Sequence, residues 1–192
     1  MNAQAQAVLD FWFGDAPLPR KEWFQKSADF DRAIGQRFGA QIEQALAGGL
    51  HAWDAEGPQS ALARILVLDQ FCRNVYRDTP LAFAGDHQAL AAALDMIDAG
   101  EDKSLAPFQR AFVYLPLEHA EDLALQEQAV ALFTALAAGE PGNQGLAGML
   151  DYARRHRDVI QRFGRFPHRN DILRRASTAA EQAFLAQPGS KF

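Results

Sequence analysis

The chain has 192 residues, of which 48% are hydrophobic, and its formal net charge at neutral pH is -5. This length suits a single domain, residues 1–192, and the acidic balance argues against nucleic acid as a partner. The one cysteine, Cys72, excludes an internal disulfide framework and a cysteine-based zinc cluster, as is typical of a reducing compartment.

The amino-terminal end and the hydrophobic runs bear on localisation. The first six residues lack the basic start and the long apolar core of a secretory signal, and Asp10 interrupts the first hydrophobic run. No window reaches the roughly 20 apolar residues that span a bilayer. We therefore predict a cytoplasmic protein without a membrane partner.

Hydrophobic residues recur at helical spacing along nearly the whole chain, and no stretch shows the period-two alternation of a strand. Glycines stand where most of these segments should stop, and prolines 58, 107 and 116 suit first helical turns. The predicted helices cover residues 3–13, 29–47, 59–76, 86–99, 107–114, 116–138, 144–163 and 178–186. The pattern predicts an all-α fold of stacked antiparallel helix pairs, without a clean repeat of about 34 residues.

The helix predicted over residues 59–76 is apolar on nearly every side in its first half, which indicates burial. Asp69, Arg73 and Arg77 then lie four residues apart on one stripe, so that Asp69 can pair with Arg73. One interpretation is a structural ion pair. The other leaves Arg77 or Asn74 available to a ligand, because an arginine binds carboxylate or phosphate through two parallel hydrogen bonds.

The helix predicted to begin at Pro116 carries three acids, Glu118, Glu121 and Asp122, in its first turn. Acids there stabilise a helix through its dipole and need no further function. His119 shares a face with apolar residues farther along and is predicted to point inward. A metal is the sharper alternative, but the Glu-x-x-His and His-Glu-x-x-His motifs are absent. We therefore predict no metal site and identify no cofactor.

The helix predicted over residues 144–163 also presents a histidine, His156, on its apolar face. If the two histidine-bearing helices pack together, His119 and His156 meet near Glu118 or Asp122. Such a cluster would form an acid–base or metal site at the centre of the domain.

The segment of residues 154–175 has eight arginines against two acids, a local charge of +6 in an acidic chain. Its loop of residues 164–170 is the strongest candidate for an anion site, because Pro167 stiffens a backbone that carries many donors. These donors are Arg165, His168, Arg169 and Asn170. The anion belongs either to a ligand or to the protein's own acidic helix at Glu118, Glu121 and Asp122, and the sequence leaves both open.

Four strings together resemble a bacterial family known as domain of unknown function nine-two-four, whose members are similar to tetratricopeptide-like helical proteins. They are VLDFWFG at residues 8–14, LDQFCRNVYR at 68–77, YLPLEHAED at 114–122 and RFGRFPHRN at 162–170. The chain departs from the family pattern at Cys72, where members usually carry proline, and at a glycine expected near Arg174. The resemblance implies a tetratricopeptide-like array, but it brings no established reaction.

Three functions remain open from the sequence. The leading hypothesis is a module that binds a small anionic ligand or an acidic peptide group between its helices. The second is a hydrolase-like enzyme in which His119 or His156 is the base, a carboxylate such as Glu118 orients it, and arginines stabilise negative charge. The third is a protein-interaction scaffold whose charge network is purely structural. The candidate ligand-binding residues are Arg73, Asn74, Arg77, His119, Asp122, His156, Arg165, His168, Arg169 and Asn170.

Overall fold

The computed structural model describes residues 2–15 and 19–190, and throughout these ranges the regular structure is helical. The helices are α1 (Ala3–Trp12), α2 (Ala28–Leu46), α3 (Pro58–Leu66), α4 (Cys72–Val75), α5 (Asp86–Asp98), α6 (Pro107–Glu118), α7 (Leu123–Gly139), α8 (Gln144–Phe163) and α9 (Ala179–Leu185). The all-α prediction is confirmed, whereas the likeness to tetratricopeptide arrays stays a prediction.

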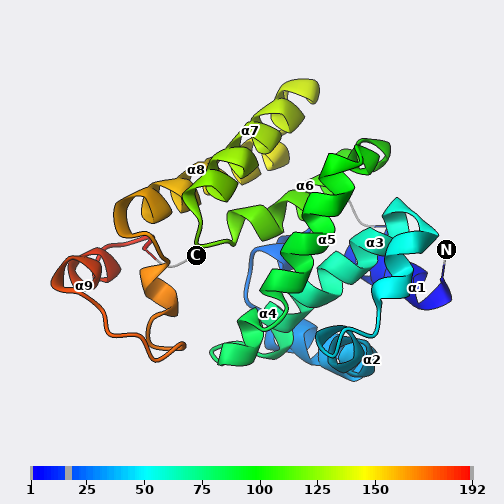
Figure 1. Cartoon of the computed structure of the whole chain (residues 1–192), viewed down its shortest axis with the longest axis horizontal. Coiled ribbons are helices and arrows are strands. Elements are labelled where there is room, and N and C mark those ends of the chain that lie inside the picture. Colours follow the sequence, from blue (N-terminus) through cyan, green and yellow to red (C-terminus); the bar gives the residue numbers. More distant parts are fainter. Residues whose placement is uncertain (1, 16–18, 191–192) are drawn as a thin grey trace.

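Shorter helical turns join these elements. Short 3-10 helices cover Lys21–Trp23, His51–Glu56, Pro80–Phe83, Glu101–Ser104 and Pro167–Arg169. A π-helical turn, Val67–Phe71, connects α3 to α4, so the two form one continuous helical run. In Figure 1, α7 lies along α8, and α9 lies at the opposite end of the molecule from α1.

Local signals account for most helix ends. Ser27 and Asn143 accept hydrogen bonds from the first turns of α2 and α8, and Thr178 forms the predicted capping box with Glu181. Gly164 ends α8 in the left-handed conformation, with φ of 69°. These ends depend on neighbouring residues alone, which is why they could be predicted.

The predicted boundary at Pro116 is wrong, because α6 continues through this proline and ends at Glu118. The chain breaks after His119 instead, since Asp122 caps α7 by accepting from the amides of Ala124 and Leu125. Glu118 therefore does not lie in a first helical turn, and its carboxyl cannot be explained by a favourable helix dipole. It lies at the carboxyl end of α6, where the dipole disfavours a negative charge.

The main hydrophobic core runs from α1 to α8, and aromatic side chains of the amino-terminal third anchor it. The Trp12 ring lies 5.6 Å from Phe71 and 5.5 Å from Phe112, which ties α1 to the central helices. Phe24, by contrast, is 58% exposed. A second, small cluster of Val159, Ile160 and Phe166 lies under the carboxyl-terminal segment.

In the described ranges, no helix has the length and apolar content needed to cross a membrane.

Candidate functional site

The π-helical turn and a glycine position the acids at the centre of the site. The turn carries Asp69 and Gln70, both buried, and single π turns within helices are frequent at functional sites. A Cβ atom on Gly85 would lie 2.3 Å from the carbonyl oxygen of Leu68 in this turn. Only glycine therefore lets α5 begin against the turn, which brings Asp86, the first residue of α5, to Arg73.

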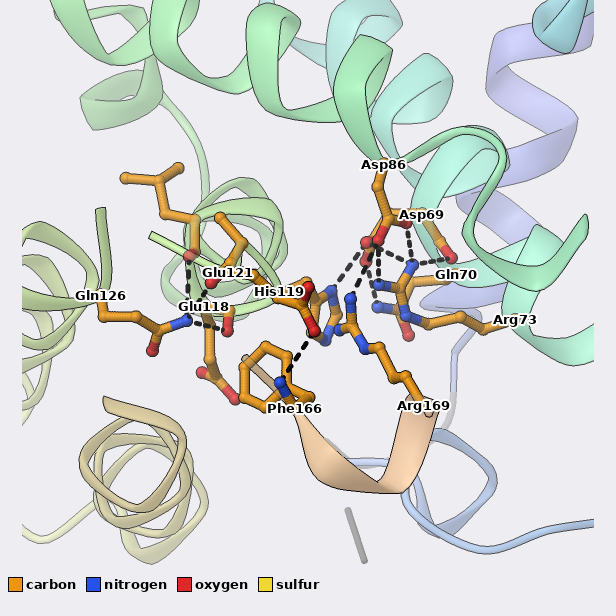
Figure 2. Close-up of polar contacts among 12 residues, drawn as sticks. Asp69, Gln70, Arg73, Asp86, Glu118, His119, Glu121, Gln126, Phe166 and Arg169 are labelled. Carbon is orange, nitrogen blue, oxygen red and sulfur yellow. Dashed lines mark hydrogen bonds and ion pairs between the residues drawn. The ribbon is translucent and has the colours of Figure 1, made fainter. Parts of the chain in front are cut away.

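Arg73 is the hub of the charge network (Figure 2). It donates to both carboxylate oxygens of Asp86, at 2.8 and 3.0 Å, and lies 2.8 Å from Asp69 Oδ1, as its spacing predicted. Arg169 reaches Asp86 more distantly, at 3.5 Å. Burial alone would raise the pKa of Asp69, but Arg73 and His119 beside it lower that pKa well below its usual range. Asp69 is therefore a carboxylate.

His119 forms a pair with this carboxylate. Its Nδ1 lies 2.7 Å from Asp69 Oδ1, although the two residues are 50 positions apart. A carboxylate only accepts hydrogen bonds, so Nδ1 carries the proton and Nε2 keeps its lone pair. Burial and the nearby Arg73 cation lower the pKa of His119 against the opposing effect of Asp69, so the imidazole is neutral near pH 7.

Glu118 and His156 form a second pair. His156 Nδ1 lies 2.9 Å from the carbonyl oxygen of Tyr152 and 3.0 Å from Glu118 Oε1. The contact has the geometry of an ion pair, but both groups are neutral. Burial, together with the charge of Asp69, raises the pKa of Glu118 to about 8, and burial together with His119 lowers the pKa of His156 to about 3.

Hydrogen-bond accounting locates the Glu118 proton. A carbonyl oxygen only accepts, so His156 Nδ1 carries a hydrogen that it directs at Tyr152 and shares with Glu118 Oε1. The proton of Glu118 therefore lies on Oε2. This oxygen is fully buried and has no hydrogen-bond partner among the described residues, which is an uncommon state for a buried polar atom.

The predicted meeting of the two histidines is observed. The ring centroids of His119 and His156 are 6.2 Å apart, beside Glu118. The position predicted for His119 is wrong, because this residue caps the carboxyl end of α6 and is not part of the helix that follows. Asp122 lies apart from this group as the exposed cap of α7.

Arg77 and Asn74, which one of the two sequence interpretations left available to a ligand, are both bonded to an acid of the protein itself. Arg77 donates to both carboxylate oxygens of Asp31 on α2, at 2.6 and 2.9 Å. Asn74 donates to the same carboxylate at 2.7 Å. Both side chains therefore have an internal partner, and both also border the cleft described below.

The arginine-rich loop is largely matched to the protein's own groups. Arg165 pairs with both oxygens of Glu181, and Asn170 contacts Arg175 and Ser177. The guanidinium of Arg169 lies between the rings of Phe83 and Phe166, 4.7 and 4.5 Å from their centroids. Burial, with Arg73 nearby, lowers the pKa of Arg169 to about 10, and burial with Arg169 nearby lowers the pKa of His168 to about 4.

The arginine-rich segment does reach the acidic segment after α6, through Arg175 and the backbone of Phe166. Arg175 donates to both oxygens of Glu121, at 2.6 and 2.8 Å, and the backbone amide of Phe166 donates to it at 2.8 Å. These bonds fasten the carboxyl-terminal segment to the end of α6. One of the two sequence alternatives was that the arginine-rich segment binds an acid of the protein itself, and this is observed for Glu121.

A cleft of about 480 Å³ opens between residues 23–26, α4, α6 and α8. One wall is aromatic and apolar, and the other is polar. The apolar wall consists of Trp23, Phe24, Phe112, Leu115, Met149 and Tyr152, and the polar wall includes Lys26, Gln70, Arg73, Asn74, Arg77, Glu118, His119 and His156. Gln25 and three residues of α8, Gln144, Gly145 and Gly148, complete the described lining. The described lining contains none of the predicted loop donors, which are Arg165, His168, Arg169 and Asn170.

Sequence reasoning missed the partners that come from distant helices. Asp31 and Asp86 meet their arginines only in the folded chain, and Asp86 has the appearance of an ordinary acid at a helix start. The cleft-lining Gly148 was also missed, although a glycine inside a helix carries a cost that signals a special role.

Within residues 2–15 and 19–190, no three histidine, cysteine or carboxylate side chains are grouped to hold a metal ion.

Comparison with known proteins identifies a family and one similar solved structure. The chain matches the family described as bacterial proteins of unknown function, DUF924, over residues 8–189. It is also similar to a solved structure, the protein of unknown function ATU0120 from Agrobacterium tumefaciens, with 39% identity and a TM-score of 0.84. That likeness covers 96% of this chain and 97% of the other. No curated protein matches. The chain belongs to the DUF924 family.

Proposed function

We propose that this family member uses the cleft to bind a small organic anion with an apolar, aromatic-sized body. The observation that carries the proposal is the charge of the lining. Its cations are Lys26, Arg73 and Arg77, and Glu118, the acid in the described lining, keeps its proton near pH 7. The acids that neutralise the arginines are not among the described residues that border the cleft.

The cations remain reachable despite their internal partners. The side chains of Arg73 and Arg77 are 18% and 30% exposed. Lys26 is exposed and forms no ion pair with any residue of the described ranges. A ligand carboxylate or phosphate at this wall therefore gains attraction from Lys26 without breaking the internal network.

The opposite wall favours an apolar body. Phe24 and Tyr152 are 58% and 48% exposed, although large aromatic side chains gain free energy from burial. Both lie along the cleft, next to Trp23 and Met149. A ring placed there would cover them, and the cleft volume falls within the roughly 300–1,000 Å³ of small-molecule sites.

Glu118 supplies the directional contact. Its Oε2 is buried without a described partner and carries a proton, so it can donate to a ligand oxygen. Satisfying such a group is worth roughly 1–3 kcal/mol, which is the cost of leaving it unpaired. The site therefore combines attraction for an anion with one specific hydrogen bond.

Isothermal titration calorimetry tests the proposal by measuring the binding of two anions, 3-phenylpropionate and phenyl phosphate. The uncharged alcohol 3-phenylpropanol is the matched control ligand. We expect the anions to bind at least tenfold more tightly than the alcohol. Lys26→Gln should weaken anion binding about fivefold, as for an exposed ion pair worth up to about 1 kcal/mol.

A pair of α8 variants tests the location. A Cβ on Gly148 meets no atom within 4 Å, so Gly148→Leu would fill the cleft and leave the charge network intact. Ala147→Leu adds the same side chain at an exposed neighbouring position outside the described lining. We expect Gly148→Leu to abolish binding and Ala147→Leu to preserve it. Equal binding by both variants, or equal affinity for the alcohol, would refute the proposal.

A further inference from the structure

His119, held by the Asp69 carboxylate, and Glu118, paired with His156, present a base and an acid to the same cleft. We propose that the cleft catalyses the keto–enol tautomerisation of a 2-oxo acid with an apolar side chain, with His119 as the base and Glu118 as the acid. This inference rests on the proposed function, because the substrate is an organic anion of the class assigned to the cleft.

His119 has the geometry of a general base. Asp69 holds its Nδ1 at 2.7 Å, and Gln70 and Arg73 in turn hold Asp69 at 2.6 and 2.8 Å. The ring is thereby fixed in the tautomer whose Nε2 bears a lone pair. No residue of the described ranges hydrogen-bonds to Nε2, and the side chain, 14% exposed, borders the cleft. Asp69 acts as a positioning residue, since it does not border the cleft.

Glu118 has the geometry of a general acid. His156 shares its Nδ1 hydrogen between the Tyr152 carbonyl and Glu118 Oε1, which leaves the carboxyl proton on Oε2. Gln126 donates to the Glu118 backbone carbonyl at 2.5 Å, so the end of α6 that carries both groups is held in place. Glu118 and His119 are consecutive residues, and both border the cleft.

The reaction balances with these two groups alone. His119 Nε2 takes a proton from the carbon next to the ketone, and the electron pair of that C–H bond becomes the carbon–carbon double bond of the enol. The carbonyl π pair moves to oxygen, which takes the proton from Glu118 Oε2. When the enol has formed, His119 is an imidazolium and Glu118 is a carboxylate. A proton that passes through solvent from His119 to Glu118 restores both groups.

The lining matches this substrate class. A 2-oxo acid brings a carboxylate for the cationic wall, a ketone oxygen for Glu118 and an acidic C–H bond for His119, while its side chain contacts the aromatic wall. Serine, threonine and cysteine are absent from the described residues of the cleft. The described lining thus provides an acid and a base without a serine, threonine or cysteine nucleophile.

Phenylpyruvate is the probe. Exchange of its methylene hydrogens for deuterium in D₂O is followed by proton NMR, and its binding is measured separately by titration calorimetry. We expect the wild-type protein and Ala147→Leu to accelerate exchange, and His119→Gln and Glu118→Gln each to lose roughly 10²-fold of that acceleration. Both substitutions keep an amide near the original polar atoms, and circular dichroism and melting temperature verify that the variants fold. Gly148→Leu, which leaves the network untouched, should abolish exchange even if a network variant does not fold.

The outcomes separate the two proposals. Tight binding of phenylpyruvate with no acceleration over buffer would overturn the catalytic inference and leave the binding function standing. Equal acceleration by wild type, His119→Gln and Glu118→Gln would also overturn it. Failure of the wild type to bind phenylpyruvate, together with failure to bind 3-phenylpropionate, would overturn both.

Discussion

Glu118→Gln should change how the stability of this protein depends on pH. The ordinary pKa of the carboxyl is 4.5, and burial together with the charge of Asp69 raises it to about 8 in the folded chain. Between these values the folded state keeps a proton that the unfolded chain has released. The wild type therefore loses stability as pH rises from about 4.5 to about 8, whereas a glutamine at this position cannot ionise.

The magnitude follows from the width of that window. Each pH unit within it is worth about 1.4 kcal/mol, so the complete window corresponds to at most about 5 kcal/mol. Between pH 6 and pH 8 the free energy of unfolding of Glu118→Gln should gain about 2–3 kcal/mol relative to the wild type. Rearrangement of His156 after Glu118 ionises would bring the measured value toward the lower figure.

Urea denaturation of both proteins at pH 6, 7 and 8 measures this difference. The other titratable groups are common to both proteins, so their contributions largely cancel in the comparison. Glu127→Gln, which removes an exposed carboxyl from α7, is the matched control. A difference between wild type and Glu118→Gln that stays constant from pH 6 to pH 8 would refute the argument that Glu118 is buried as a neutral acid.

Other parts of the structure make further predictions. Arg73→Ala should lower the free energy of unfolding by about 3–5 kcal/mol in urea, because two carboxylates lose their shared cation; a cost below about 1 kcal/mol would contradict the hub role. Gly85→Ala should lower the melting temperature, since its Cβ would overlap a backbone carbonyl, whereas Gly139→Ala, in open space, should not. Glu121→Gln should increase amide hydrogen exchange in residues 165–185, because Arg175 loses its charged partner; unchanged exchange would show that this pair does not fasten the carboxyl-terminal segment. In the wild type, hydrogen bonds from Arg175 lower the pKa of Glu121 despite its partial burial, so this fastening should weaken as pH falls below about 4.5.

The all-α class and most helix boundaries follow from the sequence because they depend on contacts between near neighbours. Helix α8 begins and ends where predicted, at Gln144 and Phe163, since its Asn143 cap and its Gly164 stop lie next to it. The pairing of Asp69 with Arg73 was predictable for the same reason, because four residues span one helical turn. The inward direction of His156 follows from the spacing of apolar residues on α8.

The break after α6 was decided by the tertiary structure. A proline in a first turn and a proline inside a helix look alike in sequence, and here α6 continues through Pro116 until Gln126 of α7 donates to the backbone carbonyls of Glu118 and Ala120. Glu118, interpreted from the sequence as a first-turn acid or as a partner of the histidines, is buried at this helix end. The same tertiary contact placed His119 at the end of α6, within reach of Asp69.

The sequence by itself thus determined the family, the helical class, the local ion pair and the identity of the inward histidines. Only the tertiary structure decided which acid each arginine meets, since Asp86 and Asp31 lie 13 and 46 positions from Arg73 and Arg77. It also decided that the arginine-rich loop turns toward internal partners while the cleft forms beside α8. The physical reason is range: helix caps and i,i+4 pairs are set by adjacent residues, whereas burial and the pKa shifts that it causes arise only when distant helices exclude water together.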